Sequence, residues 1–423
     1  MRSKLELGTR LIAHTRSGES SQDEVVIATL DENGVEVVWP EAIDMFEAFT
    51  RDADPYVPDP LILRNGSGWL TVQQGRSLGT SASSLGHSEH RIRYYRAVSA
   101  GARGVDYASV NGMQSSTDGL AAWAQRTPVT QEVRWEEASK GVVELTIRAR
   151  NLDGVPLGGP LGLELTTSYT HSPEPTGGVY SISTALEVRT RSAEPVAWDT
   201  HASAHRMIQD LMCLVYGQAC SARIGSVMHE DDQETAPTDE RRLWRDAYQP
   251  TFGRSSRGAT TLTDRVRPLF YLSDTKPDRV STWLSEYALW SRPTWIGVTP
   301  LFHQDLPVES RLLHIAVALE ALGAAIAQRD RVPPARTFTR LLTSIIDSIG
   351  FAPSAVVGSE SIDGWCRAFN AAYKGVKHAD NALPDALDAY ERAKQGLTLL
   401  RCWLAVELGV SPEVLQTNLS EGR

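Results

Sequence analysis

The sequence has few cysteines, and their spacing excludes two common kinds of site. Its four cysteines are Cys213, Cys220, Cys366 and Cys402, and no two of them form a CxxC pair. Such spacing provides neither a disulfide framework nor the closely spaced thiols of a zinc site. We therefore predict buried thiols in a reducing compartment and no metal centre.

The sequence also lacks long apolar runs. No stretch approaches the roughly 18 consecutive apolar residues of a membrane-spanning helix. The first residues carry charges at Arg2, Lys4, Glu6 and Arg10, which leaves no uninterrupted apolar segment typical of a secretion signal. These absences predict a cytoplasmic protein with no membrane partner.

Familiar nucleotide-binding and hydrolase motifs are missing as well. The chain contains no GxxxxGK[ST], GxGxxG, HExxH or GxSxG pattern. No cofactor is predicted on this basis. The formal net charge of −10 argues against an extended nucleic-acid surface, so any RNA contact is expected to be confined to one local site.

The first half of the chain has the pattern of β-strands. At 423 residues the chain exceeds the ~250–300 residues that one core serves, which predicts two or three domains. Residues 24–39 place β-branched runs on both sides of Asn33-Gly34, a dipeptide suited to a tight hairpin turn. Alternation of apolar and polar residues over 140–190 predicts an antiparallel sheet with one solvated face.

After residue 305 the pattern changes to that of helices. Four amphipathic segments are predicted at 309–330, 335–350, 361–380 and 383–409, and short connections between them favour an up-and-down bundle. The predicted fold class is therefore α+β, a β-rich N-terminal domain followed by an all-α bundle. The predicted domains are 1–198, a mixed connecting region with helical and aromatic-rich segments over 199–304, and 305–423.

The third predicted helix carries the most informative polar cluster, which comprises Arg367, Asn370, Tyr373, Lys374, Lys377 and His378. Lys374 and His378 are four residues apart, so they share one helical face. An imidazole can move a proton at neutral pH, and a neighbouring cation can stabilise charge on a phosphorane-like transition state. The alternative is an ordinary solvated helix face, with His378 at a favourable C-terminal position.

Glu320 is the second candidate because it lies within the Ala-rich apolar segment LLHIAVALEALGAAIA. We expect it to be largely buried and to have a partner on the third helix, since an unpaired buried charge costs several kcal/mol. It would either orient the basic cluster or bridge two helices structurally.

Several segments together resemble a known family. ESRLLHIAVALEAL, AFNAAYKGVKHAD and LLRCWLAVELGVSPEVL resemble the C-terminal HEPN domain of ApeA-like anti-phage proteins, and 110–130 resembles the ApeA N-terminal domain through Gly119, Leu120 and Trp123. The resemblance implies a β-rich sensing domain, a HEPN ribonuclease that dimerises around a shared cleft, and abortive defence by cleavage of RNA such as tRNA. The phage-derived trigger is not implied.

The sequence departs from the HEPN pattern. In that pattern an arginine is followed by a polar residue, and the histidine comes after four to six intervening positions. Here residues 371–373 are Ala, Ala and Tyr, and the nearest cations are Lys374 and Arg367. Two hypotheses follow. Either the chain is a ribonuclease in which His378, Lys374, Arg367 and Glu320 are catalytic and Lys377, Asn370 and Tyr373 bind RNA, or it is an inactive HEPN-like module for dimerisation and recognition.

Overall fold

The computed structural model describes residues 5–15, 24–42, 57–66, 68–83, 87–100, 105–136, 141–173, 180–232, 244–254, 266–303 and 305–422. The chain forms two compact units, each assembled from three separate segments. The first unit comprises Met1–Ser116, Arg189–Ser203 and Arg223–Gly253, and the second comprises Thr117–Val188, Ala204–Ala222 and Arg254–Arg423. The domain ranges 1–198, 199–304 and 305–423 remain predictions from the sequence; the two units divide the chain differently.

The first unit contains a closed β-barrel. Its strands are β1 (Arg10–Thr15), β2 (Glu24–Asp31), β3 (Gly34–Ala42), β4 (Leu61–Asn65), β5 (Gly68–Ser83) and β6 (His87–Ala100). They pair in the order β6-β3-β2-β1-β4-β5, and β5 also pairs with β6. This last pairing closes the sheet and removes its free edges.

The predicted turn at Asn33-Gly34 is confirmed, because β2 and β3 pair antiparallel on either side of it. Gly34 has a φ of 134°, and a Cβ at this position would lie 2.3 Å from the carbonyl oxygen of Tyr94. Glycine is therefore required both by the backbone conformation and by the neighbouring strand. Alternate residues of β2, such as Val26 and Ala28, are buried in the barrel core.

Further strands follow β6 in the sheet, and the residues of one of them are divided between the two units after Val188. These are β7 (Ser109–Thr117), β12 (Tyr180–Ala197), β13 (Ala222–Met228) and β14 (Trp244–Tyr248). The order continues from β6 as β14-β13-β7-β12, and β12 is followed directly by helix α3 (Trp198–Tyr216).

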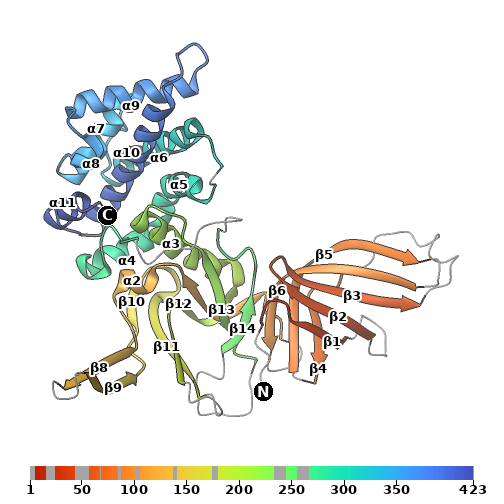
Figure 1. The fold of residues 1–423 in the computed structure, drawn as a ribbon. Coiled ribbons are helices and arrows are strands. Elements are labelled where there is room, and N and C mark those ends of the chain that lie inside the picture. The colour runs from red at the N-terminus through yellow and green to blue at the C-terminus, as the bar shows by residue number, and fades with distance from the viewer. Residues whose placement is uncertain are drawn as a thin grey trace. The chain divides into compact units, whose positions relative to one another are not determined.

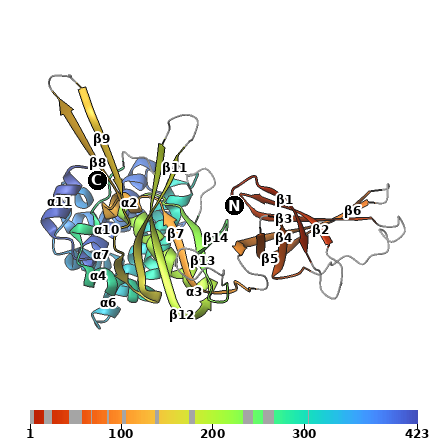
Figure 2. The ribbon, with the colours of Figure 1, turned by 90° about the horizontal axis from the view of Figure 1, so that it is seen from below.

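The second unit holds the last strands of the same sheet and two short helical elements. Strands β10 (Val155–Gly158) and β11 (Leu163–Pro173) pair antiparallel, and β12 follows β11 in the strand order. Helix α2 (Leu120–Ala124) and the 3-10 turn η1 (Pro160–Gly162) belong to the same unit. A separate hairpin of β8 (Val129–Glu136) and β9 (Gly141–Ala149) projects from this unit, as Figures 1 and 2 show.

The four helices predicted after residue 305 are present. They are α6 (Val308–Arg329), α7 (Phe338–Ile349), α9 (Ile362–Lys377) and α10 (Ala386–Glu407). Helix α6 packs against α5, α7, α9 and α10 (Figure 1), and leucine, isoleucine and aromatic side chains from these helices form the main core of the unit. The structure thus confirms a β-rich N-terminal region and a helical C-terminal region.

Shorter helices complete the unit. They are η3 (Leu272–Asp274), α4 (Pro277–Ser285), α5 (Tyr287–Val298), η4 (Thr299–Phe302), α8 (Ser354–Val357) and α11 (Pro412–Ser420). The aromatic-rich middle region predicted from the sequence is thus helical over α4 and α5, where Trp283 and Trp290 are buried.

Helix α6 is long and apolar enough to cross a membrane by length and composition alone. In this fold Leu312, Leu319 and Leu322 on α6 are fully buried against neighbouring helices. A buried core helix passes the same test of length and composition, so one such helix is only weak evidence of a membrane span.

Candidate functional site

Helix α9 carries the polar cluster. A side-chain cap holds its first turn, and its apolar face packs on the bundle. The side chain of Ser361 accepts a hydrogen bond from Gly364 N at 3.1 Å and caps the first turn. Trp365 and Phe369 are buried, whereas Arg367 and Lys374 are exposed. The apolar face therefore packs on the bundle and leaves the cations in solvent.

His378 is the residue at which α9 ends. Its main-chain N–H donates to the carbonyl oxygen of Lys374 at 2.9 Å, and its φ of −121° is extended rather than helical. The side chains of Lys374, Lys377 and His378 are all exposed. This end of a helix carries a partial negative charge, which favours the cations of its last turn.

The chain folds back tightly after His378. The N–H of Asn381 donates to the carbonyl oxygen of His378 at 3.1 Å. Gly375 lies directly beneath the returning chain, because a Cβ there would be 2.4 Å from the carbonyl oxygen of Ala382. Close passage of the returning backbone therefore places His378 at a defined turn at the end of α9.

Glu320 differs from its predicted environment. The prediction that it is buried is wrong, because its side chain lies on the exposed side of α6. The predicted partner on the third helix is present: the hydroxyl of Tyr373 donates to Glu320 Oε2 at 3.4 Å. Lys377 Nζ in turn donates to the Tyr373 hydroxyl at 3.1 Å, which gives a chain from carboxylate through phenol to ammonium.

Tyr373 is the centre of this chain. Only 4% of its surface is exposed, and its ring contacts Phe338 of α7 with ring centroids 5.0 Å apart. Lys377 Nζ lies 5.0 Å from the centre of the same ring, a cation–π distance. The hydrogen bond to Tyr373 raises the pKa of Lys377, so this ammonium stays charged at neutral pH.

The remaining predicted residues lie farther along α9. Arg367 precedes the end of the helix by ten residues, which corresponds to about 15 Å at 1.5 Å per residue. Arg367 shares a helical face with Asn370 and Lys374, and its backbone lies about three turns before His378. The structure thus brings Glu320, Tyr373 and Lys377 together, places Lys374 one turn from His378, and leaves Arg367 apart.

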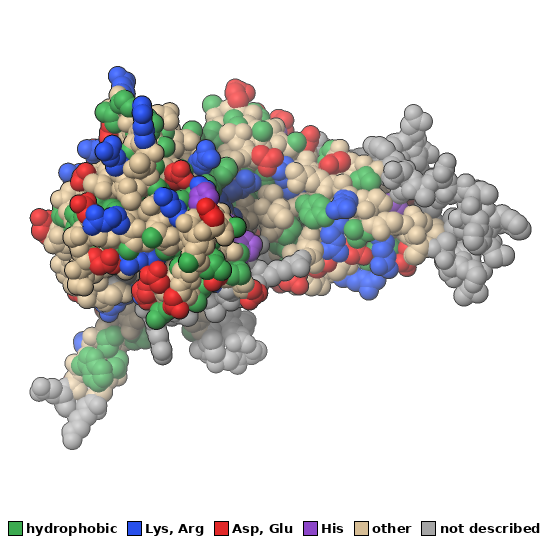
Figure 3. All heavy atoms as spheres, turned by 90° about the horizontal axis from the view of Figure 1, so that it is seen from above, with side chains coloured by type: hydrophobic (Ala, Val, Ile, Leu, Met, Phe, Trp, Pro, Cys, Tyr) green, Lys and Arg blue, Asp and Glu red, His purple; other side chains and the backbone are tan. Residues whose placement is uncertain are grey.

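Charges of both signs lie on the visible face of the helical bundle in Figure 3. On the face shown in Figure 3, Lys and Arg side chains are interspersed with Asp and Glu over the part formed by the bundle. Any anionic substrate would therefore be held by a few local cations. Among the described residues, no group of three or more His, Cys, Asp or Glu side chains is placed to hold a metal ion.

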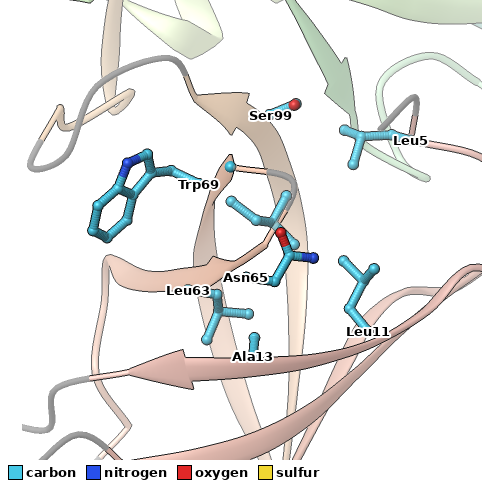
Figure 4. A pocket seen from close by; sticks show the side chains of 9 residues that line it. Leu5, Leu11, Ala13, Leu63, Asn65, Trp69 and Ser99 are labelled. Atoms are coloured by element: carbon cyan, nitrogen blue, oxygen red, sulfur yellow. The ribbon is translucent and has the colours of Figure 1, made fainter. Parts of the chain in front are cut away.

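Two cavities contain none of the predicted site residues. One, at the barrel of the first unit, has a volume of about 20 Å³ and is lined by residues that include Leu11, Leu63 and Trp69 (Figure 4). This space holds about one water molecule and no larger ligand. The other has a volume of about 430 Å³ and lies in the second unit beside Tyr390 and Lys394. The only sequence signal for it is the spacing of these two residues, four apart on α10.

The Gly-Leu-x-x-Trp segment forms the start of helix α2. Gly119 caps the helix with a φ of 78°, and its carbonyl oxygen accepts a hydrogen bond from the Tyr216 hydroxyl at 2.7 Å. Leu120 and Trp123 are buried in the core of the second unit. The segment is therefore structural, since it anchors a glycine-capped turn on helix α3.

Comparison with known proteins identifies the family. The family described as ApeA N-terminal domain 1 matches residues 41–283. No curated protein and no solved structure matches the chain. The family match covers more than half of the chain, includes the Gly119 to Trp123 segment and ends before α6 begins. The chain therefore belongs to the family of proteins that carry an ApeA N-terminal domain 1.

Proposed function

We propose that this protein is an ApeA-like anti-phage defence protein that cleaves RNA with its C-terminal helical bundle. Membership of the ApeA N-terminal family carries the defence part of the proposal. The exposed His378 beside Lys374 at the end of α9 carries the ribonuclease part. A cytoplasmic location follows from the proposed substrate, cellular RNA such as tRNA.

In the proposed reaction, the ribose 2′-hydroxyl of the RNA attacks the adjacent phosphorus. The new bond from the 2′-oxygen to phosphorus replaces the bond from phosphorus to the 5′-oxygen of the next nucleotide, so the products are a 2′,3′-cyclic phosphate and a free 5′-hydroxyl. His378 takes part in moving the proton from the 2′-hydroxyl to the leaving 5′-oxygen, and the ammonium of Lys374 stabilises the charge that develops on the phosphate oxygens. No metal is required for this chemistry. Lysine supplies a point charge where arginine would supply two parallel hydrogen bonds, so a lower rate is expected than with arginine at this position.

Lys377, Tyr373 and Glu320 have a positioning role in this proposal. Tyr373 is buried, and its hydroxyl accepts a hydrogen bond from Lys377 and so anchors it. Glu320 accepts a hydrogen bond from the same hydroxyl. The anchored ammonium would contact the RNA backbone next to the cleaved bond. Asn370, half-buried one turn before Lys374, would donate to the same strand.

The separation of Arg367 from His378 supports a dimeric site. Because about 15 Å of helix lies between them, Arg367 can act at the phosphate near His378 only if it comes from a second copy of the chain. We therefore propose a homodimer through the bundle, in which the α9 helices of two chains face one another across the RNA.

A non-catalytic role is the second candidate. It is favoured by one observation: positions 371–373 hold Ala, Ala and Tyr, and Tyr373 is buried, so no arginine of the same chain stands at the spacing before His378 that the HEPN pattern has. In this alternative the bundle dimerises and recognises a partner, and His378 only ends the helix.

The two candidates are separated by incubating the purified full-length protein with total RNA and with tRNA, with and without lysate from phage-infected cells. Cleavage that is lost in His378→Ala and reduced at least tenfold in Lys374→Gln supports the ribonuclease. His171→Ala and Arg340→Gln remove an exposed histidine and an exposed arginine elsewhere and should leave cleavage unchanged. No cleavage under any condition, or equal cleavage by His378→Ala, would refute the ribonuclease proposal.

The dimeric site has its own test. Arg367→Gln and His378→Ala chains, each inactive, should regain part of the activity when mixed, because one site of the mixed dimer then holds both native residues. A mixture without activity, or an Arg367→Gln protein that cleaves like the native one, would exclude a contribution of Arg367 from the second copy.

A further inference from the structure

The second unit contains a cavity of about 430 Å³, whose lining includes no residue of α9. Its lining comes from the loop after α3, from α5 and η4, from the start of α6 and from α10: Gly217, Gln218, Ala219, Gly297, Pro300, Leu301, Arg311, Ile315, Tyr390, Ala393, Lys394 and Leu397. A volume in the range of about 300–1,000 Å³ is typical of sites for small organic ligands.

The two charged side chains in the lining of this cavity, Arg311 and Lys394, are both basic. Lys394 and Tyr390 lie four residues apart on α10, so both project from the same face of that helix. Arg311 lies on the first turn of α6, and its guanidinium donates to the carbonyl oxygens of Leu306 at 3.1 Å and His303 at 3.4 Å. Two cations in one cavity of a chain with net charge −10 make this a local site for an anion.

The rest of the lining is apolar and smooth. Ile315, Leu397 and Ala393 provide aliphatic surface next to the Tyr390 ring, which is 45% exposed. An aromatic ring stacked on the phenol of Tyr390 would lie against this aliphatic wall.

The loop that closes one side of the cavity is held in place by a buried residue. Arg401 donates to the carbonyl oxygens of Leu214 and Val215, the last turn of α3. Gly217 follows with a φ of 65°, and a Cβ there would meet the Arg401 guanidinium at 3.0 Å. The cavity wall at Gly217 and Gln218 is therefore preformed, which lowers the entropic cost of ligand binding.

We propose that this cavity binds a small phosphate ester with an aromatic ring, the chemistry of a nucleoside monophosphate. The phosphate is paired with Arg311 and Lys394, the ring stacks on Tyr390, and the aliphatic wall covers its other side. The proposal depends on the cavity alone and does not require RNA cleavage. A ligand here contacts both Gly217 to Ala219, inside the family-matched region, and helices α6 and α10 of the bundle.

The test is isothermal titration of the full-length protein with four probes: adenosine 5′-monophosphate, uridine 5′-monophosphate, adenosine and ribose 5-phosphate. Both nucleotides should bind at least tenfold more tightly than adenosine, which lacks the phosphate, and than ribose 5-phosphate, which lacks the ring. Lys394→Gln should weaken nucleotide binding at least tenfold, and Tyr390→Ala should reduce it to the level of ribose 5-phosphate. Both residues are exposed, so these variants are expected to fold normally.

Arg336→Gln is the matched control, because it removes one exposed positive charge of the same unit outside the cavity lining. It should bind the nucleotides as the native protein does. The proposal is overturned if neither nucleotide binds, if adenosine binds as tightly as the nucleotides, or if Lys394→Gln and Arg336→Gln weaken binding equally.

Discussion

Arg401 caps the end of helix α3 through the carbonyl oxygen of Leu214, to which its Nε donates at 2.8 Å; a second nitrogen donates to Val215 O at 3.0 Å. The two partners are separated by nearly 190 residues, so this contact joins α10 to a segment of the family-matched region. Burial lowers the pKa of Arg401 to about 10, which leaves the guanidinium charged at neutral pH. A buried charge that bonds main-chain carbonyls at a helix C-terminus is stabilised by the helix dipole.

Arg401→Met is expected to lower the free energy of unfolding by about 2 kcal/mol. The substitution keeps the aliphatic volume but leaves the carbonyl oxygens of Leu214 and Val215 buried without these donors. Urea denaturation followed by circular dichroism measures the loss. Arg367→Met, at an exposed position, should shift the unfolding midpoint little. If the two proteins have the same free energy of unfolding, the prediction is wrong. The energy gained by no longer burying a guanidinium charge would then equal the energy lost with its two hydrogen bonds.

The helical half was predictable because its signal is local. Long segments with a period of 3.6 residues placed α6, α7, α9 and α10 within a few residues of their observed bounds. The hairpin turn at Asn33-Gly34 was predictable for the same reason, since two residues determine the turn.

Features that depend on distant parts of the chain were not predictable. The barrel also requires two strands that are distant in sequence, β1 and β4, to pair, and in this pairing His14 lies opposite Arg64. Glu320 shows a related limit, because an apolar stretch of sequence does not reveal which residue of a core helix faces outward. The partner of Arg401 lies on another segment, and no local pattern indicates it.

His201 makes the first unit sensitive to acid. Burial lowers the pKa of its imidazole, whose nitrogens bond the Thr190 hydroxyl at 2.8 Å and the carbonyl oxygen of Val110 at 3.1 Å. With a folded pKa below the unfolded value of about 6.5, the unfolded chain binds the extra proton first. The free energy of unfolding should therefore fall as the pH decreases below about 6.5, until the pH reaches the lower folded pKa.

The contribution of this one group is measured by comparing native protein and His201→Gln in urea between pH 5 and pH 8. The glutamine amide can both donate and accept, so it keeps hydrogen-bonding capacity without a titrating proton. As the pH decreases from 8 to 5, the free energy of unfolding of the native protein should fall more than that of His201→Gln. His14→Gln, at an exposed histidine of β1, serves as the control and should leave the pH profile unchanged.

The β8–β9 hairpin has one charged and one apolar face. Arg134 pairs with Glu144 and Arg148 pairs with Glu132, each at 3.5 Å, across the charged face. The other face exposes large apolar side chains, whose exposed fractions include 70% for Trp135, 53% for Leu145 and 48% for Ile147. A contiguous apolar face of this kind binds hydrophobic dyes.

Replacing Leu145 and Ile147 together with threonine should reduce the fluorescence of bound anilinonaphthalene sulfonate while changing the free energy of unfolding by less than about 0.5 kcal/mol. Threonine is β-branched, a shape that a strand accepts. Val188→Thr, at a position that is 0% exposed, should instead destabilise the protein by about 1–2 kcal/mol. Unchanged dye fluorescence in the double variant would show that this face does not bind the dye.

Gly396 is where α10 passes closest to its neighbours. A Cβ at this position would lie 2.5 Å from Ile315 Cγ2 of α6 and 3.0 Å from the ring of Phe369 on α9. Alanine in place of glycine gains about 1 kcal/mol of helix propensity. Overpacking of a filled core costs about 1–3 kcal/mol, and here two helices must move apart, so the steric cost should exceed the gain.

Gly396→Ala is therefore expected to lower the free energy of unfolding, as measured by urea denaturation, although alanine is the better helix former. A double-mutant cycle with Ile315→Ala identifies the cause. Removal of the Ile315 methyl groups opens the space that the new Cβ needs, so the double variant should lose less stability than the sum of the two single variants. An additive result would assign the loss to Phe369 or to a shift of the whole helix, and a stabilised Gly396→Ala protein would show that α6 and α10 are not in close contact at this point.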